Sequence, residues 1–174
     1  MSSPDAPRPP RLFRYAPQAS IERSLSLGEF RLRPAGDALS NSGSAQILPF
    51  GARPNVASPA SYLILSLSST WDPRMFTDFP DADCCLVIND PESFGERIHR
   101  AAQRALPHWA GIDAAVTYGM PTLLGAAFSK DKALARQKEW LFAWRPMQAR
   151  MSVNPLVIQI GNIESIAELR MKPD

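Results

Sequence analysis

Three short pieces of the sequence carry side chains that could do chemistry, and they lie far apart along the chain. Near the start, Arg14 stands inside the short apolar run LFRY. Late in the chain, Gln137 and Glu139 are separated by one residue, just before another apolar run. Between them, an apolar run ends in three hydroxyl side chains, Ser68, Ser69 and Thr70. A guanidinium can grip an anion through two parallel hydrogen bonds, and a preorganised carboxylate can stabilise developing positive charge.

Cysteines and histidines give weaker signals. Cys84 and Cys85 are adjacent inside an apolar run, so in a strand their side chains would point to opposite faces and are not expected to bridge. His99 and His108 are the only histidines, and no cluster of cysteines or carboxylates with metal-ligand spacing accompanies them. We therefore expect no metal cofactor, and we interpret these residues as structural rather than as a Cys–His catalytic pair.

The composition is that of an ordinary globular chain. Its 174 residues suffice for one domain with a sizeable core, and 45% hydrophobic and 21% charged residues exclude a disordered or fibrous chain. A formal net charge of +2 argues against a strong overall attraction to nucleic acid or to anionic membranes. No apolar run approaches the roughly 20 residues that span a bilayer, and no apolar signal segment opens the chain. We predict a cytoplasmic protein with no membrane contact.

Proline placement and hydrophobic runs predict the organisation of the chain. Of 17 prolines, nine precede residue 60, and residues 1–10 are expected to form a disordered leader before a single α+β domain over 11–174. Residues 34–60 predict a long loop, of a kind that often serves as a lid or mobile segment. Apolar runs predict strands at 12–15, 30–33, 62–68, 84–88, 114–118, 140–144 and 156–160.

Capping signals predict three helices. A short one is capped by Ser20 and ends at Gly28, and a longer amphipathic one has Asp90 at its N-cap and ends before Pro107. A brief helix over residues 132–138 leads directly into a strand. Strands therefore dominate the expected α+β fold.

The order of the three reactive pieces resembles that of a known enzyme class. Arginine, strand-end hydroxyls and Gln-x-Glu follow one another in the Arg-Ser-Glu class of ADP-ribosyltransferases, and LFRYAPQASIERSLSLGEFRLRP resembles the opening strand–helix–strand of that superfamily. The order of LFRY, LSLS and FSKDKALARQKEW is also similar to an uncharacterised bacterial family linked with abortive phage infection. The resemblance covers the order of elements over most of the chain. It implies two packed, mainly antiparallel or mixed sheets with flanking helices and an NAD cleft between them.

The resemblance also implies roles for individual residues, with NAD as substrate. Cleavage of the nicotinamide–ribose bond passes through an oxocarbenium-like cation, which the Glu139 carboxylate would stabilise. Gln137 would orient the nucleophile from the same face of a strand, and Arg14 would hold the NAD phosphates. Ser68, Ser69 and Thr70 would hold the ribose or position Glu139. The rings that could stack on nicotinamide are Tyr15, Tyr62 and Trp71.

Each of these residues also has a structural interpretation. Arg14 could be a surface residue on an edge strand, and Glu139 could be a solvated charge beside two basic residues. Hydroxyls followed by Asp72-Pro73 are typical of a turn or helix cap.

Two other functions therefore stay open beside ADP-ribose transfer to a macromolecular acceptor, protein or nucleic acid, or to water. One is a non-catalytic binding or regulatory module of the same fold. The other is a nucleic-acid-binding protein that uses the basic excess in the outer thirds of the chain. A bacterial toxin, effector or phage-defence setting is implied by the resemblance alone, and the oligomeric state is open.

Overall fold

The structure, a computed structural model, describes residues 6–35, 62–148 and 153–174. This part of the chain has an α+β fold built mainly of antiparallel strands, which confirms the predicted class. Nearly all of the loop predicted at residues 34–60, and the first five residues of the predicted leader, lie outside the described residues. None of the described helices is both long and apolar enough to cross a membrane.

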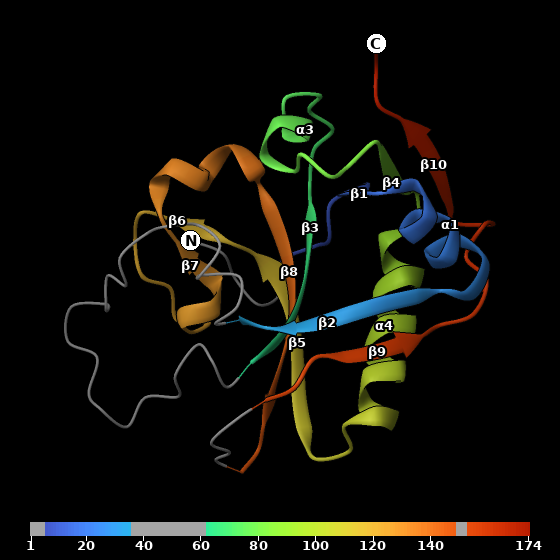
Figure 1. Cartoon of the computed structure of the whole chain (residues 1–174). Helices are drawn as coiled ribbons and strands as arrows, with labels where there is room; N and C mark the ends of the chain where they lie inside the picture. Colours follow the sequence, from blue (N-terminus) through green and yellow to red (C-terminus); the bar gives the residue numbers. More distant parts are fainter. Residues whose placement is uncertain (1–5, 36–61, 149–152) are drawn as a thin grey trace.

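Eight strands form one connected antiparallel sheet around β3 (Figure 1). The main path runs β10–β4–β1–β3–β2–β9, and β8 lies between β3 and β5. The strands are β1 (Leu12–Ala16), β2 (Glu29–Pro34), β3 (Leu63–Ser68), β4 (Cys84–Ile88), β5 (Trp109–Ala115), β8 (Glu139–Pro146), β9 (Leu156–Gln159) and β10 (Ala167–Met171). A separate pair of short parallel strands consists of β6 (Thr117–Tyr118) and β7 (Ser129–Lys130).

The two edges of β3 are used differently. One edge pairs with β8 over the whole length of β3. The opposite edge is shared, because β1 pairs at its Ser68 end and β2 pairs at its Leu63 end. Strands β1 and β2 therefore diverge from a common neighbour, and β3 joins the two halves of the sheet.

The helices and short layers cover both faces of this sheet (Figure 1). Helices α1 (Gln18–Leu27) and α4 (Pro91–Ala105) lie on one face. On the other face lie α3 (Met75–Asp78) and the segment that holds β6, β7 and the 3-10 helices η2 (Ala126–Phe128) and η3 (Lys132–Gln137). Along β8, Trp140, Phe142 and Trp144 enter the core with the two helices, whereas Leu141 and Ala143 enter the opposite core. Burial on both faces explains why β3, β4 and β8 read as nearly continuous apolar runs.

Most predicted elements are confirmed, and the exceptions have local causes. The αL glycine Gly28 ends α1, and the Asp90 side chain accepts a hydrogen bond from Ser93 N at the start of α4. Ser20 is not the N-cap of α1, because that helix already begins after Pro17. The run predicted at 114–118 is split between β5, which begins five residues earlier, and β6. Strand β10, AELRM, alternates apolar and polar residues over five positions but was not predicted, and neither was α3, which has only four residues.

Asp113 is the centre of a buried polar cluster that the sequence did not reveal. Arg8 donates to both of its carboxylate oxygens, at 2.7 and 2.9 Å. His99 Nε2 and Trp140 Nε1 complete the cluster at 2.7 and 2.8 Å. Arg8 belongs to the segment that was predicted as a disordered leader, but the structure ties it to the domain through Asp113 and Glu92. His99 also packs near two core aromatic rings, as its structural interpretation expected.

These contacts set the pKa of Asp113. Burial alone would raise the pKa, but the hydrogen bonds from Arg8, His99 and Trp140 outweigh it and hold the pKa well below its usual range. A carboxylate whose pKa is lowered in the folded state stabilises the fold above its unfolded pKa of about 3.9. That contribution is lost as the pH falls below this value.

We expect Asp113→Asn to lower the free energy of unfolding by about 3 kcal/mol at pH 7, because Arg8 would lose its buried partner charge. The difference from the wild type should shrink as the pH falls from about 4 to about 2, because the unfolded wild-type carboxylate takes up a proton there while the folded one stays ionised. Denaturant unfolding across this pH range measures both effects. Asp81→Asn, on an exposed side chain, is the matched control and should stay within about 0.5 kcal/mol of the wild type. A difference for Asp113→Asn that does not change with pH would contradict this role.

Candidate active site around Glu139

The three reactive pieces of the sequence meet in neighbouring strands. Phe13 of β1 lies opposite Ser68 of β3, and Ser68 lies opposite Glu139 of β8. Residues separated by more than 120 positions in the sequence therefore occupy one row across the sheet. This row marks the place where a shared site is possible.

Glu139 is the first residue of β8 and carries a buried carboxylate, with 8% of its side chain exposed. Its Oε1 accepts hydrogen bonds from Ser66 Oγ and Lys130 Nζ, both at 2.6 Å. Its Oε2 accepts one from the Tyr118 hydroxyl at 3.1 Å. We call Ser66, Tyr118, Lys130 and Glu139 the Glu139 cluster. The surface interpretation of Glu139 is thereby excluded.

Local structure explains how these four side chains converge. Lys138 ends η3 in the left-handed conformation, with φ of 41°, so the chain turns sharply into β8 at Glu139. Tyr118 and Lys130 lie side by side because β6 and β7 pair in parallel at these positions. The Tyr118 hydroxyl also accepts a hydrogen bond from the Glu139 backbone N–H at 2.9 Å, which fixes it against the start of β8.

The electrostatics of the Glu139 cluster leave some hydrogen-bonding capacity unused. Burial raises the pKa of Tyr118, and the nearby Glu139 raises it further, so the phenol keeps its proton at neutral pH and donates to the carboxylate. A carboxylate has about four acceptor positions on its two oxygens. Two donors bind Oε1 of Glu139 and one binds Oε2, so one position on Oε2 is unused. Oε2 can therefore still accept a hydrogen bond, for example from a sugar hydroxyl.

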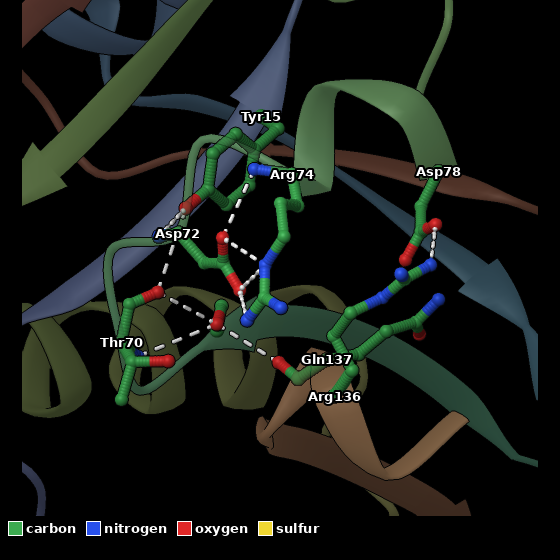
Figure 2. A network of polar contacts seen from close by, with 8 residues as sticks. Tyr15, Thr70, Asp72, Arg74, Asp78, Arg136 and Gln137 are labelled. Carbon is green, nitrogen blue, oxygen red and sulfur yellow. Dashed lines mark hydrogen bonds and ion pairs between the residues drawn. The ribbon is translucent and has the colours of Figure 1, made fainter. Parts of the chain in front are cut away.

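The strand-end hydroxyls bind backbone carbonyl groups. Ser68 Oγ donates to the carbonyl oxygen of Gln137 at 2.8 Å, and Ser69 Oγ donates to that of Lys138 at 2.9 Å. Thr70 lies in the adjoining turn, where Figure 2 shows it beside Tyr15 and Asp72. Ser68 and Ser69 thus fasten the turn that leads into Glu139, and their hydroxyls have the contacts of a structural turn.

Gln137 does not share a strand with Glu139, so the expectation that both side chains lie on one strand face is wrong. Gln137 is the last residue of η3, and β8 begins only after Lys138. Residues two apart share a face only within a continuous strand, and Lys138, in the left-handed conformation, interrupts the chain between Gln137 and Glu139. In Figure 2, Gln137 lies beside Arg136, which pairs with Asp78.

Arg14 lies on the other face of the sheet from Glu139. Its neighbours Phe13 and Tyr15 face α3, whereas the Arg14 guanidinium lies 3.4 Å from the hydroxyls of Ser20 and Ser24 of α1. Burial lowers the pKa of Arg14, and the positive charge of Arg33 lowers it further. Strand β1 is paired on both sides, so its interpretation as an edge strand is also wrong.

Tyr15, one of the three rings that could stack on nicotinamide, is packed in the core. Tyr15 stacks with Trp71 at a centroid distance of 5.8 Å and meets Phe76 edge-on. Its hydroxyl accepts a hydrogen bond from Asp72 N, and burial raises its pKa to about 12 (Figure 2).

Cys84 and Cys85 are free, buried thiols, and burial raises the pKa of each to about 12. Thiols that keep their proton at neutral pH are poor nucleophiles. The structural interpretation of both cysteines therefore agrees with their surroundings.

Three members of the Glu139 cluster were not predicted. Ser66 was hidden within an apolar strand, and Tyr118 and Lys130 come from short strands that contact β8 only in the folded chain. The run LILSLS, which puts Ser66 between two leucines, is the one local signal that could have pointed to it.

We expect Lys130→Met to lower the free energy of unfolding by about 3 kcal/mol, because it leaves the Glu139 carboxylate buried without its counter-charge. Adding Glu139→Gln should restore part of this loss, because the buried charge is then removed as well. Thermal and denaturant unfolding measure the cycle. Lys132→Met, on an exposed neighbour, is the control and should change stability by less than about 0.5 kcal/mol. Equal decreases in the free energy of unfolding for Lys130→Met and Lys132→Met would show that the Lys130–Glu139 ion pair does not stabilise the fold.

Comparison of the chain with protein-family models, with curated proteins and with solved structures finds no match in any of the three.

Proposed function

We propose that this protein cleaves NAD at the nicotinamide–ribose bond and passes the ADP-ribose to a macromolecule or to water, with Glu139 as the catalytic carboxylate. The observation that carries the proposal is the placement of the Glu139 carboxylate, held by Ser66 and Tyr118 in the row where β1, β3 and β8 meet. The order of the arginine, the strand-end hydroxyls and Gln-x-Glu along the sequence was the basis of the resemblance to ADP-ribosyltransferases. Their fold and an NAD cleft are part of the proposal.

The proposed reaction breaks the bond between the ribose C1′ and the nicotinamide nitrogen. The bonding electron pair leaves with nicotinamide, which loses its positive charge. The ribose becomes an oxocarbenium-like cation, which the carboxylate stabilises. An oxygen of water or of an acceptor then bonds to C1′ and releases its proton to solvent. Oε2 of Glu139, with acceptor capacity left, is the atom we assign to the ribose hydroxyl.

The donors around Glu139 have separate tasks in this proposal. Ser66 and Tyr118 keep the carboxylate in one orientation, so little reorganisation is needed when positive charge develops. Lys130 pairs with the carboxylate, but its own charge opposes a cation nearby. A bound substrate must therefore draw Lys130 away from Oε1, and the partial exposure of the lysine, 13% of its side chain, leaves it a way towards solvent.

A second candidate is a non-catalytic binding module, and two observations favour it. The Lys130–Glu139 pair is closed and nearly buried, as in a structural ion pair. Arg14, which the resemblance assigned to the NAD phosphates, projects from the opposite face. The NAD experiment distinguishes the two functions.

We expect purified protein to release nicotinamide from NAD, and we expect Glu139→Gln to lower the rate at least about 100-fold because the charge that stabilises the cation is lost. Chromatography of nicotinamide and ADP-ribose measures the reaction. Tyr118→Phe, which keeps the ring but removes a donor, should give a smaller decrease. Glu96→Gln makes the same chemical change on the exposed side of α4 and should stay within about twofold of the wild type.

Folded wild-type protein that releases no nicotinamide, with water or with added protein and nucleic acid acceptors, would overturn the proposal. The binding module would then be the better function. Circular dichroism and thermal unfolding of each variant separate a loss of activity from a loss of fold.

Expression in a bacterial host tests the toxin or phage-defence setting that the resemblance implies. An NAD-consuming protein should slow growth and lower cellular NAD, and Glu139→Gln should relieve both effects. Arg31→Gln, on an exposed side chain of β2, is the control and should slow growth and lower NAD as the wild type does. Growth inhibition that persists in Glu139→Gln at equal protein levels would separate toxicity from this site.

A further inference from the structure

Three arginines line one flank of α4 and form the wall of a surface hollow. Arg97, Arg100 and Arg104 are spaced by three and four residues, so they lie next to one another on the helix surface. The opposite wall is the end of β9 and the turn after it, from Gln159 to Gly161. The hollow has a volume of about 310 Å³. We call it the α4–β9 groove, and Figure 1 shows its two walls side by side.

The charge of this groove is not neutralised within the described residues. None of the three guanidinium groups pairs there with a carboxylate within ion-pair distance. Arg97 donates one hydrogen bond to the carbonyl oxygen of Asn162, which anchors it to the far wall. Of the acidic side chains nearby in sequence, Glu92 pairs with Arg8, and Glu164 accepts from Asn162. Glu96, one turn before Arg100, is exposed.

The core-facing side of α4 explains why this flank is available. Phe94, Ile98 and Ala102 are fully buried at intervals of four residues, and they fix the rotation of the helix against the sheet. The arginines are therefore presented beside β9 by the packing of the helix. Gly161 leaves the far wall of the groove without a side chain at this position. A Cβ there would meet nothing within 4 Å, and the φ of +81° favours glycine.

We propose that the α4–β9 groove binds the phosphate groups of a small polyphosphate anion such as a nucleotide. Arginine suits this task because its planar guanidinium donates two parallel hydrogen bonds to phosphate oxygens. The groove is at the small end of ligand sites, and the three arginines span only about 10 Å of helix. These dimensions favour a short row of phosphates over a long nucleic-acid backbone, as does the formal net charge of +2.

This site is separate from the Glu139 cluster. Helix α4 packs on the face of the sheet that carries Trp140 and Phe142, whereas Glu139 opens towards the face that carries Leu141. The groove can therefore bind phosphates whether or not the protein cleaves NAD.

Titration calorimetry of the full chain at fixed low salt tests the proposal, with inorganic phosphate, pyrophosphate and ADP as probes. We expect pyrophosphate and ADP to bind more tightly than phosphate. Arg100→Gln combined with Arg104→Gln should weaken pyrophosphate binding at least about tenfold, through the loss of charge-assisted hydrogen bonds. Both side chains are exposed, so the variant should keep its fold, and Arg104→Gln alone is the second variant if it does not.

The control combines Arg31→Gln with Arg145→Gln, which removes the same charge from exposed positions outside the groove. It should stay within about twofold of the wild type. No binding of pyrophosphate, or equal weakening in both double variants, would overturn the proposal. A single-stranded RNA of about 20 nucleotides that binds far more tightly than pyrophosphate through the same arginines would also overturn it, in favour of a nucleic-acid surface.

Discussion

A buried carboxylate needs partners, and the partners of Glu139 determine how one side of this molecule is assembled. The ion pair with Lys130 and the hydrogen bonds from Ser66 and Tyr118 join three parts of the chain at the start of β8. Loss of any one partner would leave charge or hydrogen-bond acceptor capacity buried without compensation. The short strands β6 and β7 have little apolar surface of their own, so this cluster holds them to the central sheet together with the apolar contacts of Val116 and Phe128.

The next residue along the chain performs the corresponding task on the opposite face. Trp140 donates to Asp113, which also holds Arg8 and His99. Successive residues of a strand point to opposite faces, so Glu139 and Trp140 together connect β8 to both layers that cover the sheet. The beginning of β8 is therefore the point where an N-terminal arginine, helix α4 and the β6–β7 layer are all fastened.

The same geometry shapes the proposed chemistry. A carboxylate that is oriented by fixed donors can stabilise developing positive charge without first reorganising. The lysine that pairs with Glu139 also competes with a cationic substrate, so the contact that stabilises the fold opposes the proposed activity. The α4–β9 groove has no such conflict, because Arg100 and Arg104 are exposed, Arg97 is half-buried, and the helix is already secured by its apolar side.

Local patterns predicted the elements with strong periods or caps. The runs of β1, β3, β4, β8 and β9 and the capped helix α4 follow from side chains within a few residues of one another. The shortest elements escaped prediction. Strand β10 alternates apolar and polar residues over only five positions, and it pairs along the edge of β4. Gly111 of β5 is explained by the indole of Trp144 and the imidazole of His99 packed against it.

Composition and local patterns specified the α+β class, the separation of the reactive residues into three pieces and the burial of the adjacent cysteines. These features depend on residue content and on contacts between near neighbours. Which faces those three pieces present was set by strand pairing in the folded chain. A shift of one position along a strand moves a side chain to the other face, so Arg14 and Glu139 were separated by pairing register, which no local pattern records. The partners of Glu139 and Asp113 were likewise decided by pairing between distant segments, because a buried charge is satisfied by whatever the folded chain brings to it.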